Sequence, residues 1–305
     1  MPNRNIIRQI AAALVVVGFL ALFEHGRAVK KFNVAIDIGH SPGETGTLSA
    51  RNRAEYDFNR KMALEIFRKL KKNPRLGVFI INPEGETISM ESRTKMINAA
   101  VPDLLISIHH DSVQPIYLSE WTWKGAPALF CDKYRGYSIF TSDKNVKWGQ
   151  SISFAITLGH EMRKSGFMPS AHHSEPISGE GKKLIDECAG VYRFDELAVL
   201  KNAKCPAVLL ECGIIRNRSE ETLLRNRPYR QRIAGAIASA VSAFLDTRAA
   251  GRPERLLETQ DKAGERFLVL VRQGLYLSEL PAHHAPIFAL DERLYPSFEE
   301  GDQCG

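Results

Sequence analysis

The fold is decided by the stretch Phe32-Asn33-Val34-Ala35-Ile36-Asp37-Ile38-Gly39, an apolar, β-branched run that ends at a glycine and is followed by His40. A short run of this composition is typical of a strand that is buried on both faces. Such strands belong to sheets that helices cover on both sides. The stretch therefore predicts an α/β fold with a polar residue, His40, just after the carboxyl end of its first strand.

The chain on the C-terminal side of this strand alternates between helix and strand. Apolar residues at helical spacing predict helices over 55–70 and 90–100, and the second of these stops before Pro102. Buried strands are predicted over 78–81, 104–109 and 206–213. Shorter segments predict a strand at 128–131 and helices over 146–164, 219–226 and 228–247. This β-α-β-α-β order predicts one sheet with helices on both faces.

One main domain is predicted over 29–248. Residues 113–190 are less regular than the rest, and we interpret them as a segment inserted into that domain. Composition changes after Ala249, where Ala249-Ala250-Gly251-Arg252-Pro253 resembles a linker. Residues 249–305 are therefore a predicted linker and short C-terminal appendage, to which the sequence assigns no role.

The N-terminus has the pattern of an export signal. Arg4 and Arg8 precede an apolar run over 10–23, and the small residues Gly26 and Ala28 follow it. This pattern predicts a signal peptide over 1–28, cleaved after Ala28, and a protein exported to the periplasm or cell wall. The run is shorter than the roughly 20 apolar residues of a membrane span, so no stable span is expected after cleavage. A retained anchor and a buried core helix are the alternatives.

Charge and cysteine content exclude some classes of protein. The net charge of +6 is spread along the chain without a run of Lys and Arg, so nucleic-acid binding is not expected. A mildly basic protein is attracted to a polyanionic surface, although the same charge would also serve solubility alone. The five cysteines permit disulfides after export, and their odd number leaves at least one thiol unpaired within the chain.

Polar residues stand where an α/β sheet places its active site, at the carboxyl ends of strands. His40, His109 and Glu211 each end or follow a predicted strand, and Glu55 opens a helix, where the helix dipole favours a carboxylate. Two histidines, a carboxylate and a water make a catalytic zinc site, with a further carboxylate as base. The alternative is that each is an isolated polar residue at a strand end.

Four motifs carry a resemblance to a known family. They are Asp37-Ile38-Gly39-His40, Glu55-Tyr56-Asp57-Phe58-Asn59, the segment from Arg93 to His109, and Pro206-Ala207-Val208-Leu209-Leu210-Glu211-Cys212-Gly213 through Asn217. In this order, over 33–247, they resemble the zinc-dependent N-acetylmuramoyl-L-alanine amidases of the amidase 3 type. That family cleaves the amide bond between the glycan and the stem peptide of peptidoglycan.

The resemblance implies a mixed sheet flanked by helices, with His40, Glu55 and His109 as Zn²⁺ ligands. It also implies that Glu211 is the general base for attack by zinc-activated water. The chain departs from the family at His110-Asp111, where Ala-Asn is common, and at Ser41-Pro42, where glycines are common. These differences concern substrate contacts more than metal binding.

Candidate substrate contacts are His110, His172, His173 and Asn217. His110 follows His109 directly, so in an extended strand it points the opposite way. His172 and His173 lie in the inserted segment, where they would line the substrate groove or belong to a solvated loop.

Peptidoglycan is the partner that the resemblance implies. Some relatives carry an inserted segment that shields the zinc, so we expect part of 113–190 to cover the groove until an activator protein moves it. Two alternatives remain open. One is another zinc-dependent cell-wall hydrolase, a carboxypeptidase or a deacetylase, and the other is a non-catalytic wall-binding protein with the same fold.

Overall fold

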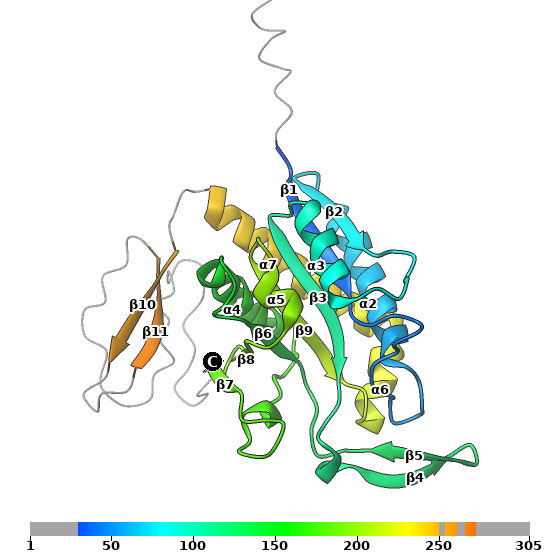
Figure 1. Ribbon diagram of the computed structural model, residues 1–305. Coiled ribbons are helices and arrows are strands. Elements are labelled where there is room, and N and C mark those ends of the chain that lie inside the picture. The colour runs from blue at the N-terminus through cyan, green and yellow to red at the C-terminus, as the bar shows by residue number, and fades with distance from the viewer. Residues whose placement is uncertain (1–29, 250–253, 261–265, 273–305) are drawn as a thin grey trace, which may run out of the picture. The chain divides into compact units, whose positions relative to one another are not determined.

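The computed structural model describes residues 30–249, 254–260 and 266–272. Residues 30–249 are built around a seven-stranded sheet (Figure 1). The strands lie in the order β2-β1-β3-β9-β6-β8-β7. Their bounds are β1 Phe32–Ile38, β2 Leu76–Ile81, β3 Leu104–Asp111, β6 Ser138–Thr141, β7 Lys183–Asp186, β8 Val191–Arg193 and β9 Ala207–Ile214. The helices are α2 Glu55–Leu70, α3 Met90–Ala99, α4 Trp148–Lys164, α5 Ala198–Asn202, α6 Arg218–Arg225 and α7 Arg227–Ala249.

The sheet is mixed, as the resemblance implied. Strands β2, β1, β3 and β9 pair in parallel, and β6 pairs antiparallel to β9. Beyond β6, β8 is parallel to it and β7 is antiparallel to β8. Because the first four strands are parallel, their carboxyl ends meet at one edge, which is the edge where the sequence placed its polar residues.

Helices cover both faces, which explains the nearly continuous apolar run of β1. Side chains alternate along a strand between the two faces of a sheet. Val34 and Ile36 pack in the cluster that contains residues of α2, α4 and α7, while Ala35 packs in a second cluster with residues of α3 and α5. The predicted arrangement of helices on both faces is confirmed.

The region predicted as an insertion is partly core. It contributes β6 to the sheet, and α4 buries Ile152, Phe154 and Leu158. The parts that stay outside the seven-stranded sheet include an antiparallel hairpin of β4 (Ser119–Trp123) and β5 (Ala126–Phe130), which we call the arm, and the turns η1 (Pro115–Tyr117) and η2 (His172–Ser174).

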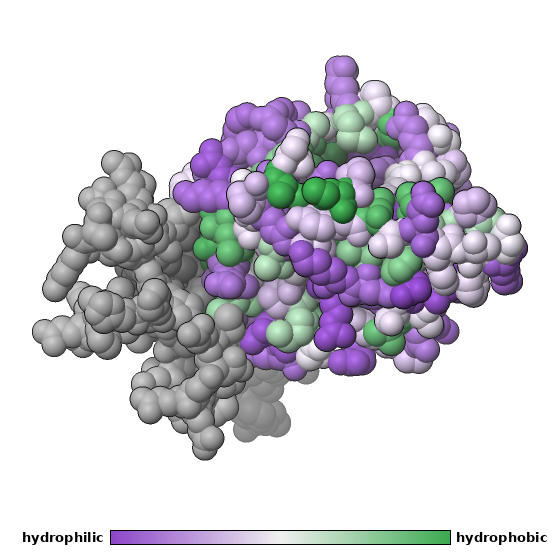
Figure 2. Space-filling model, turned by 90° about the horizontal axis from the view of Figure 1, so that it is seen from below, coloured by the Kyte–Doolittle hydropathy of each residue, from purple (hydrophilic) through white to green (hydrophobic). Residues whose placement is uncertain are grey.

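The predicted signal peptide and most of the predicted tail lie outside the described residues. Within the tail, β10 (Glu254–Gln260) pairs antiparallel with β11 (Arg266–Arg272). Among the described residues, no helix combines the length and apolar character that a membrane span requires. Figure 2 views the molecule from below Figure 1, from the carboxyl ends of β1 and β3, and hydrophilic and hydrophobic residues are interspersed there.

Candidate active site

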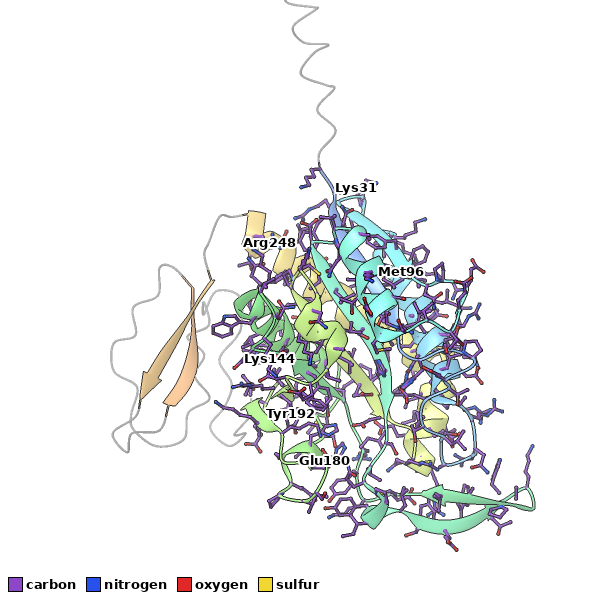
Figure 3. The ribbon with its side chains drawn as sticks, viewed as in Figure 1. Lys31, Met96, Lys144, Glu180, Tyr192 and Arg248 are labelled. Carbon is purple, nitrogen blue, oxygen red and sulfur yellow. The ribbon has the colours of Figure 1, made fainter. Side chains whose placement is uncertain are left out.

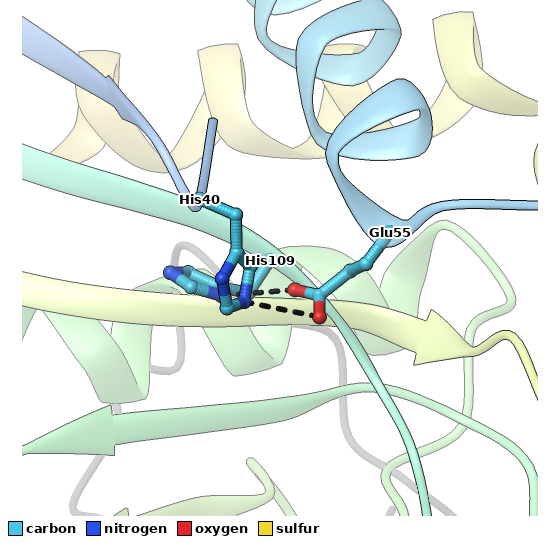
Figure 4. A group of neighbouring side chains, drawn as sticks. All are labelled: His40, Glu55 and His109. Atoms are coloured by element: carbon cyan, nitrogen blue, oxygen red, sulfur yellow. Dashed lines mark hydrogen bonds and ion pairs between the residues drawn. The ribbon is translucent and has the colours of Figure 1, made fainter. Parts of the chain in front are cut away.

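Three side chains from three elements converge at the carboxyl edge of the sheet (Figure 4). His40 follows β1, Glu55 is the first residue of α2, and His109 lies near the end of β3. One carboxylate oxygen of Glu55 lies 3.1 Å from His40 Nε2, and the other lies 3.0 Å from His109 Nδ1. The Glu55 side chain is 6% exposed, whereas His40 is 32% exposed, so the cluster opens on the histidine side.

Two glycines make room for these side chains. A Cβ at Gly39 would lie 2.3 Å from His109 Nε2, and a Cβ at Gly46 would lie 2.4 Å from Glu55 Oε2. Gly46 also has a φ of +73°, a conformation that glycine adopts more readily than other residues. The backbone therefore packs directly against the candidate ligands, and any larger residue at these two positions would displace them.

Asn59 orients the Glu55 carboxylate from within α2. Its side-chain amide donates to Glu55 Oε1 at 3.1 Å and to the carbonyl of Gly39 at 3.1 Å. Burial alone would raise the pKa of Glu55, but hydrogen bonds from His109 and His40 outweigh it and lower the pKa well below its ordinary value. Glu55 is therefore held as a carboxylate, the form that binds a metal.

A buried ion pair fixes the turn that carries His40. Arg93, from α3, donates to Asp37 at 2.7 Å and to the carbonyl of His40 at 2.9 Å. The hydroxyl of Ser107 donates to the other oxygen of Asp37 at 2.7 Å. His40 has a φ of 66°, which is uncommon for a residue other than glycine. The role of Asp37 and Arg93 was not predicted from the sequence, although a charged residue inside an apolar strand is a signal of a buried ion pair.

Glu211 lies beside the cluster on the neighbouring strand. It is the direct register partner of His109 in the parallel β3–β9 pair. Its Oε2 is buried and has no hydrogen-bond partner in the described part of the chain. Burial raises the pKa of Glu211 well above its ordinary value, and the charges of Asp111 and Glu55 raise it further. The side chain also lines a pocket of about 240 Å³ together with Asp111 and His173.

The residues of the cluster fit a zinc ion. Two imidazole nitrogens and a carboxylate oxygen are the donor set of many catalytic zinc sites. Ligand atoms about 2.0–2.2 Å from a tetrahedral ion lie about 3.3–3.6 Å apart. The two Glu55–histidine separations are 3.1 and 3.0 Å, and one ligand atom from each of the three side chains lies within 4.8 Å of the others. The lack of Cβ atoms at Gly39 and Gly46 leaves the ligand side chains the space they occupy.

Comparison with known proteins identifies the family of this chain. The family model for N-acetylmuramoyl-L-alanine amidase matches residues 34–243. The chain belongs to this amidase family. It is 27% identical over 245 residues to the probable amidase AmiB of Haemophilus influenzae, and this alignment covers 74% of this chain and 55% of that protein. It is 24% identical over 214 residues to the probable cell wall amidase LytH of Staphylococcus aureus, and this alignment covers 70% of this chain and 58% of that protein. The chain thus spans little more than half the length of either relative.

Solved amidase structures share the fold. The amidase of Clostridium difficile 630 superposes with a TM-score of 0.55 at 23% identity and covers 72% of this chain and 98% of its own. The CwlD amidase of Clostridioides difficile, solved in complex with the GerS lipoprotein, superposes with a TM-score of 0.54 at 18% identity. The superposition covers 71% of this chain and 100% of the CwlD chain.

Two of the candidate substrate contacts have structural roles in this amidase-family chain. His110 is 1% exposed and packs against Phe58, and its Nδ1 pairs with Asn59 at 2.7 Å. Burial lowers the pKa of His110 to about 3. Asn217 is the N-cap of α6, where its side-chain oxygen accepts from the backbone of Ser219 and Glu220. Burial leaves His110 no surface to offer a substrate, and the cap occupies the amide oxygen of Asn217.

The other two candidates, His172 and His173, are not in a solvated loop. They are 1% and 5% exposed, and both rings face Asp111 at the end of β3. Burial lowers the pKa of His172. Burial would also lower the pKa of His173, but contacts with Asp111 and Glu180 outweigh it and raise this pKa to about 9. The expectation of a solvated loop is wrong because a buried carboxylate compensates for the burial of two imidazoles. Glu180 was not recognised in the sequence.

Proposed function

We propose that this chain is a zinc-dependent N-acetylmuramoyl-L-alanine amidase that hydrolyses the amide between N-acetylmuramic acid and L-alanine in peptidoglycan. The observation that carries the proposal is the convergence of His40, Glu55 and His109 in a member of this family. These three residues would hold Zn²⁺. The chemistry that zinc supplies when bound is polarisation of the scissile carbonyl and activation of water near neutral pH.

The residues of the chain divide the remaining work between them. Glu211 takes a proton from the attacking water and delivers it to the leaving amine of L-alanine. Its register with His109 supports this role, because neighbouring strands lie only about 4.8 Å apart. Asn59 and Arg93 do not touch the reacting atoms; they hold Glu55 and the His40 turn in position.

The inserted segment is the proposed regulatory element. We propose that part of 113–190 covers the substrate groove and lowers basal activity until an activator protein moves it. The arm, residues 119–130, supports this idea because Trp121 donates a hydrogen bond to the carbonyl of Ala50, in the loop that leads to Glu55. A relative, CwlD, is found in complex with a lipoprotein. Deleting the arm should raise hydrolysis; a folded deletion variant with unchanged activity would show that the arm is no lid.

Export completes the proposal. The N-terminal pattern of Arg4, Arg8 and the apolar run over 10–23 supports cleavage after Ala28 and delivery to the cell wall. N-terminal sequencing of protein recovered from outside the cytoplasmic membrane tests this cleavage. Full-length chain recovered only from the cytoplasm would contradict export.

The proposed reaction is tested by mass spectrometry of purified peptidoglycan digested with the zinc-loaded protein. An amidase releases intact stem peptides with a free N-terminal L-alanine. Released D-alanine would indicate a carboxypeptidase, and released acetate would indicate a deacetylase. Absence of any product from a folded, zinc-loaded protein would favour a non-catalytic wall-binding protein.

A further inference from the structure

A second cluster of metal-ligating side chains lies beside the active site. Asp111, at the end of β3, meets His172 and His173 of the turn η2. Asp111 Oδ2 lies 2.8 Å from His173 Nε2 and 3.3 Å from His172 Nε2, and the two rings are 3.8 Å apart between centroids. These separations are like those of the first cluster, and the donor set is again two imidazole nitrogens and a carboxylate oxygen.

The ring nitrogens that face away from Asp111 are both occupied. His172 Nδ1 lies 2.9 Å from the hydroxyl of Ser170, and His173 Nδ1 lies 2.9 Å from Glu180 Oε2. Glu180 is fixed in turn, because Lys182 donates to the same oxygen at 2.7 Å. Histidines that ligate metals almost always have an oxygen partner on the other nitrogen, which orients the ring and fixes its tautomer.

An ion-pair network alone does not satisfy this cluster. A protonated His173 between Asp111 and Glu180 would have a partner on each nitrogen. His172 is different: its side chain is fully buried, and its Nε2, 3.3 Å from Asp111 Oδ2, makes no well-formed hydrogen bond in the described part of the chain. A buried polar nitrogen without a well-formed hydrogen bond destabilises the folded state. A cation bound between the three side chains would engage this nitrogen.

The surroundings favour a cation. The adjoining pocket is lined by three carboxylates, those of Asp111, Glu180 and Glu211, and by one ammonium group, that of Lys182. Glu180 and Tyr192, both labelled in Figure 3, contact His173, the first by a hydrogen bond and the second by its ring.

We propose that Asp111, His172 and His173 form a second divalent-metal site, with a donor set suited to Zn²⁺, beside Glu211. Glu211 adjoins both sites, because it is the register partner of His109 and lines the same pocket as Asp111 and His173. Metal at this site ties the turn η2 to the end of β3 and so forms one wall of the pocket beside Glu211.

Metal content tests the proposal without any substrate, so its outcome is separate from that of the proposed reaction. Full-length protein equilibrated with Zn²⁺ and dialysed should contain about two equivalents, measured by inductively coupled plasma mass spectrometry. The His40→Ala/His109→Ala protein should keep one equivalent, because two ligands of the first site are gone. Adding His172→Ala to this protein should remove the remaining equivalent. His160→Ala, in α4 and in neither cluster, should leave both.

A milder pair of variants covers the case in which loss of His172 unfolds the chain. Ser170→Ala removes only the partner of His172 Nδ1 and should weaken the second equivalent roughly 10- to 100-fold. Ser174→Ala is the matched control, since this exposed hydroxyl of the same turn donates to the carbonyl of Ala171, whereas the Nδ1 atoms of His172 and His173 pair with Ser170 and Glu180. Titration with Co²⁺ followed by visible absorption reads out both affinities. The proposal is overturned if wild-type protein binds a single equivalent that His40→Ala/His109→Ala abolishes, or if Ser170→Ala leaves the second affinity unchanged.

Discussion

Replacing Gly39 with alanine should displace His109 from the metal centre. The new Cβ would lie 2.3 Å from His109 Nε2 and 2.4 Å from its Cε1. Unbonded heavy atoms pack at about 3.5–4.0 Å, so the ring or the backbone must move by roughly 1 Å or more. Gly39 does not have a left-handed backbone, and alanine can adopt its conformation. The contact with His109 is therefore the reason for a glycine at this position.

The displacement should affect metal and turnover far more than folding. Metal–ligand distances tolerate about 0.2 Å, and a misplacement of about 1 Å in an active site can cost roughly 10²-fold in rate. Overpacking by one methyl group typically costs about 1–3 kcal/mol, which a domain stable by about 5–15 kcal/mol survives. We expect a folded Gly39→Ala protein with lower zinc content and activity reduced on the order of 10²-fold.

The assay compares Gly39→Ala with a control that makes the same chemical change. A Cβ at Gly235, in α7, meets nothing within 4 Å. Gly235→Ala should keep zinc and activity and gain about 0.5–1 kcal/mol of stability, because alanine favours the helix. Zinc content, amide hydrolysis and thermal unfolding are measured on both. A Gly39→Ala protein with full zinc and full activity would refute the close packing of His109 on the turn.

Two further predictions concern carboxylates. Glu211→Gln keeps the size of the side chain but cannot accept a proton, so this variant should retain zinc and lose roughly 10²–10⁴-fold in turnover. His109→Ala should lose both zinc and turnover, so zinc analysis and hydrolysis rates distinguish the two variants. A fully active Glu211→Gln protein would contradict the assignment of Glu211 as the general base. Burial raises the pKa of Glu220 from 4.5 to about 7, so the folded state binds this proton more tightly than the unfolded state. The stability that protonated Glu220 contributes should be fully present below about pH 4.5 and should be lost, by on the order of 1–3 kcal/mol, as the pH rises through 7. The free energy of urea unfolding should differ less between pH 5 and pH 8 in Glu220→Gln than in the wild-type protein. Equal differences in the two proteins would contradict this role of Glu220.

Much of the fold was predictable because its signals are local. The strand over 32–38 reads as a nearly continuous apolar run, since both of its faces are buried, and α2 was predicted over the residues where the structure has it, Glu55–Leu70. The convergence of His40 with His109 followed from one rule, that parallel strands bring their carboxyl ends to the same edge. The N-cap role of Asn217 was also readable, because Glu220 follows three residues later at the start of a helix.

The rest depends on contacts between distant parts of the chain. Strands β6 and β8 have four and three residues, too few for a periodic pattern. β6 is a strand because β9 provides an edge on which it pairs, and β8 is a strand because it pairs in turn with β6. His173 is 62 residues from Asp111, so nothing local distinguishes it from a solvated histidine.

The most direct measurement of the central claim follows isotope from solvent into product. Purified peptidoglycan is digested with the zinc-loaded protein in H₂¹⁸O, and the products are examined by mass spectrometry. If water attacks the carbonyl that joins muramic acid to L-alanine, one ¹⁸O appears in the lactyl carboxylate of the glycan and none in the L-alanine amine product. Label in the peptide carboxylate or in released acetate, with an unlabelled lactyl group, would contradict the account.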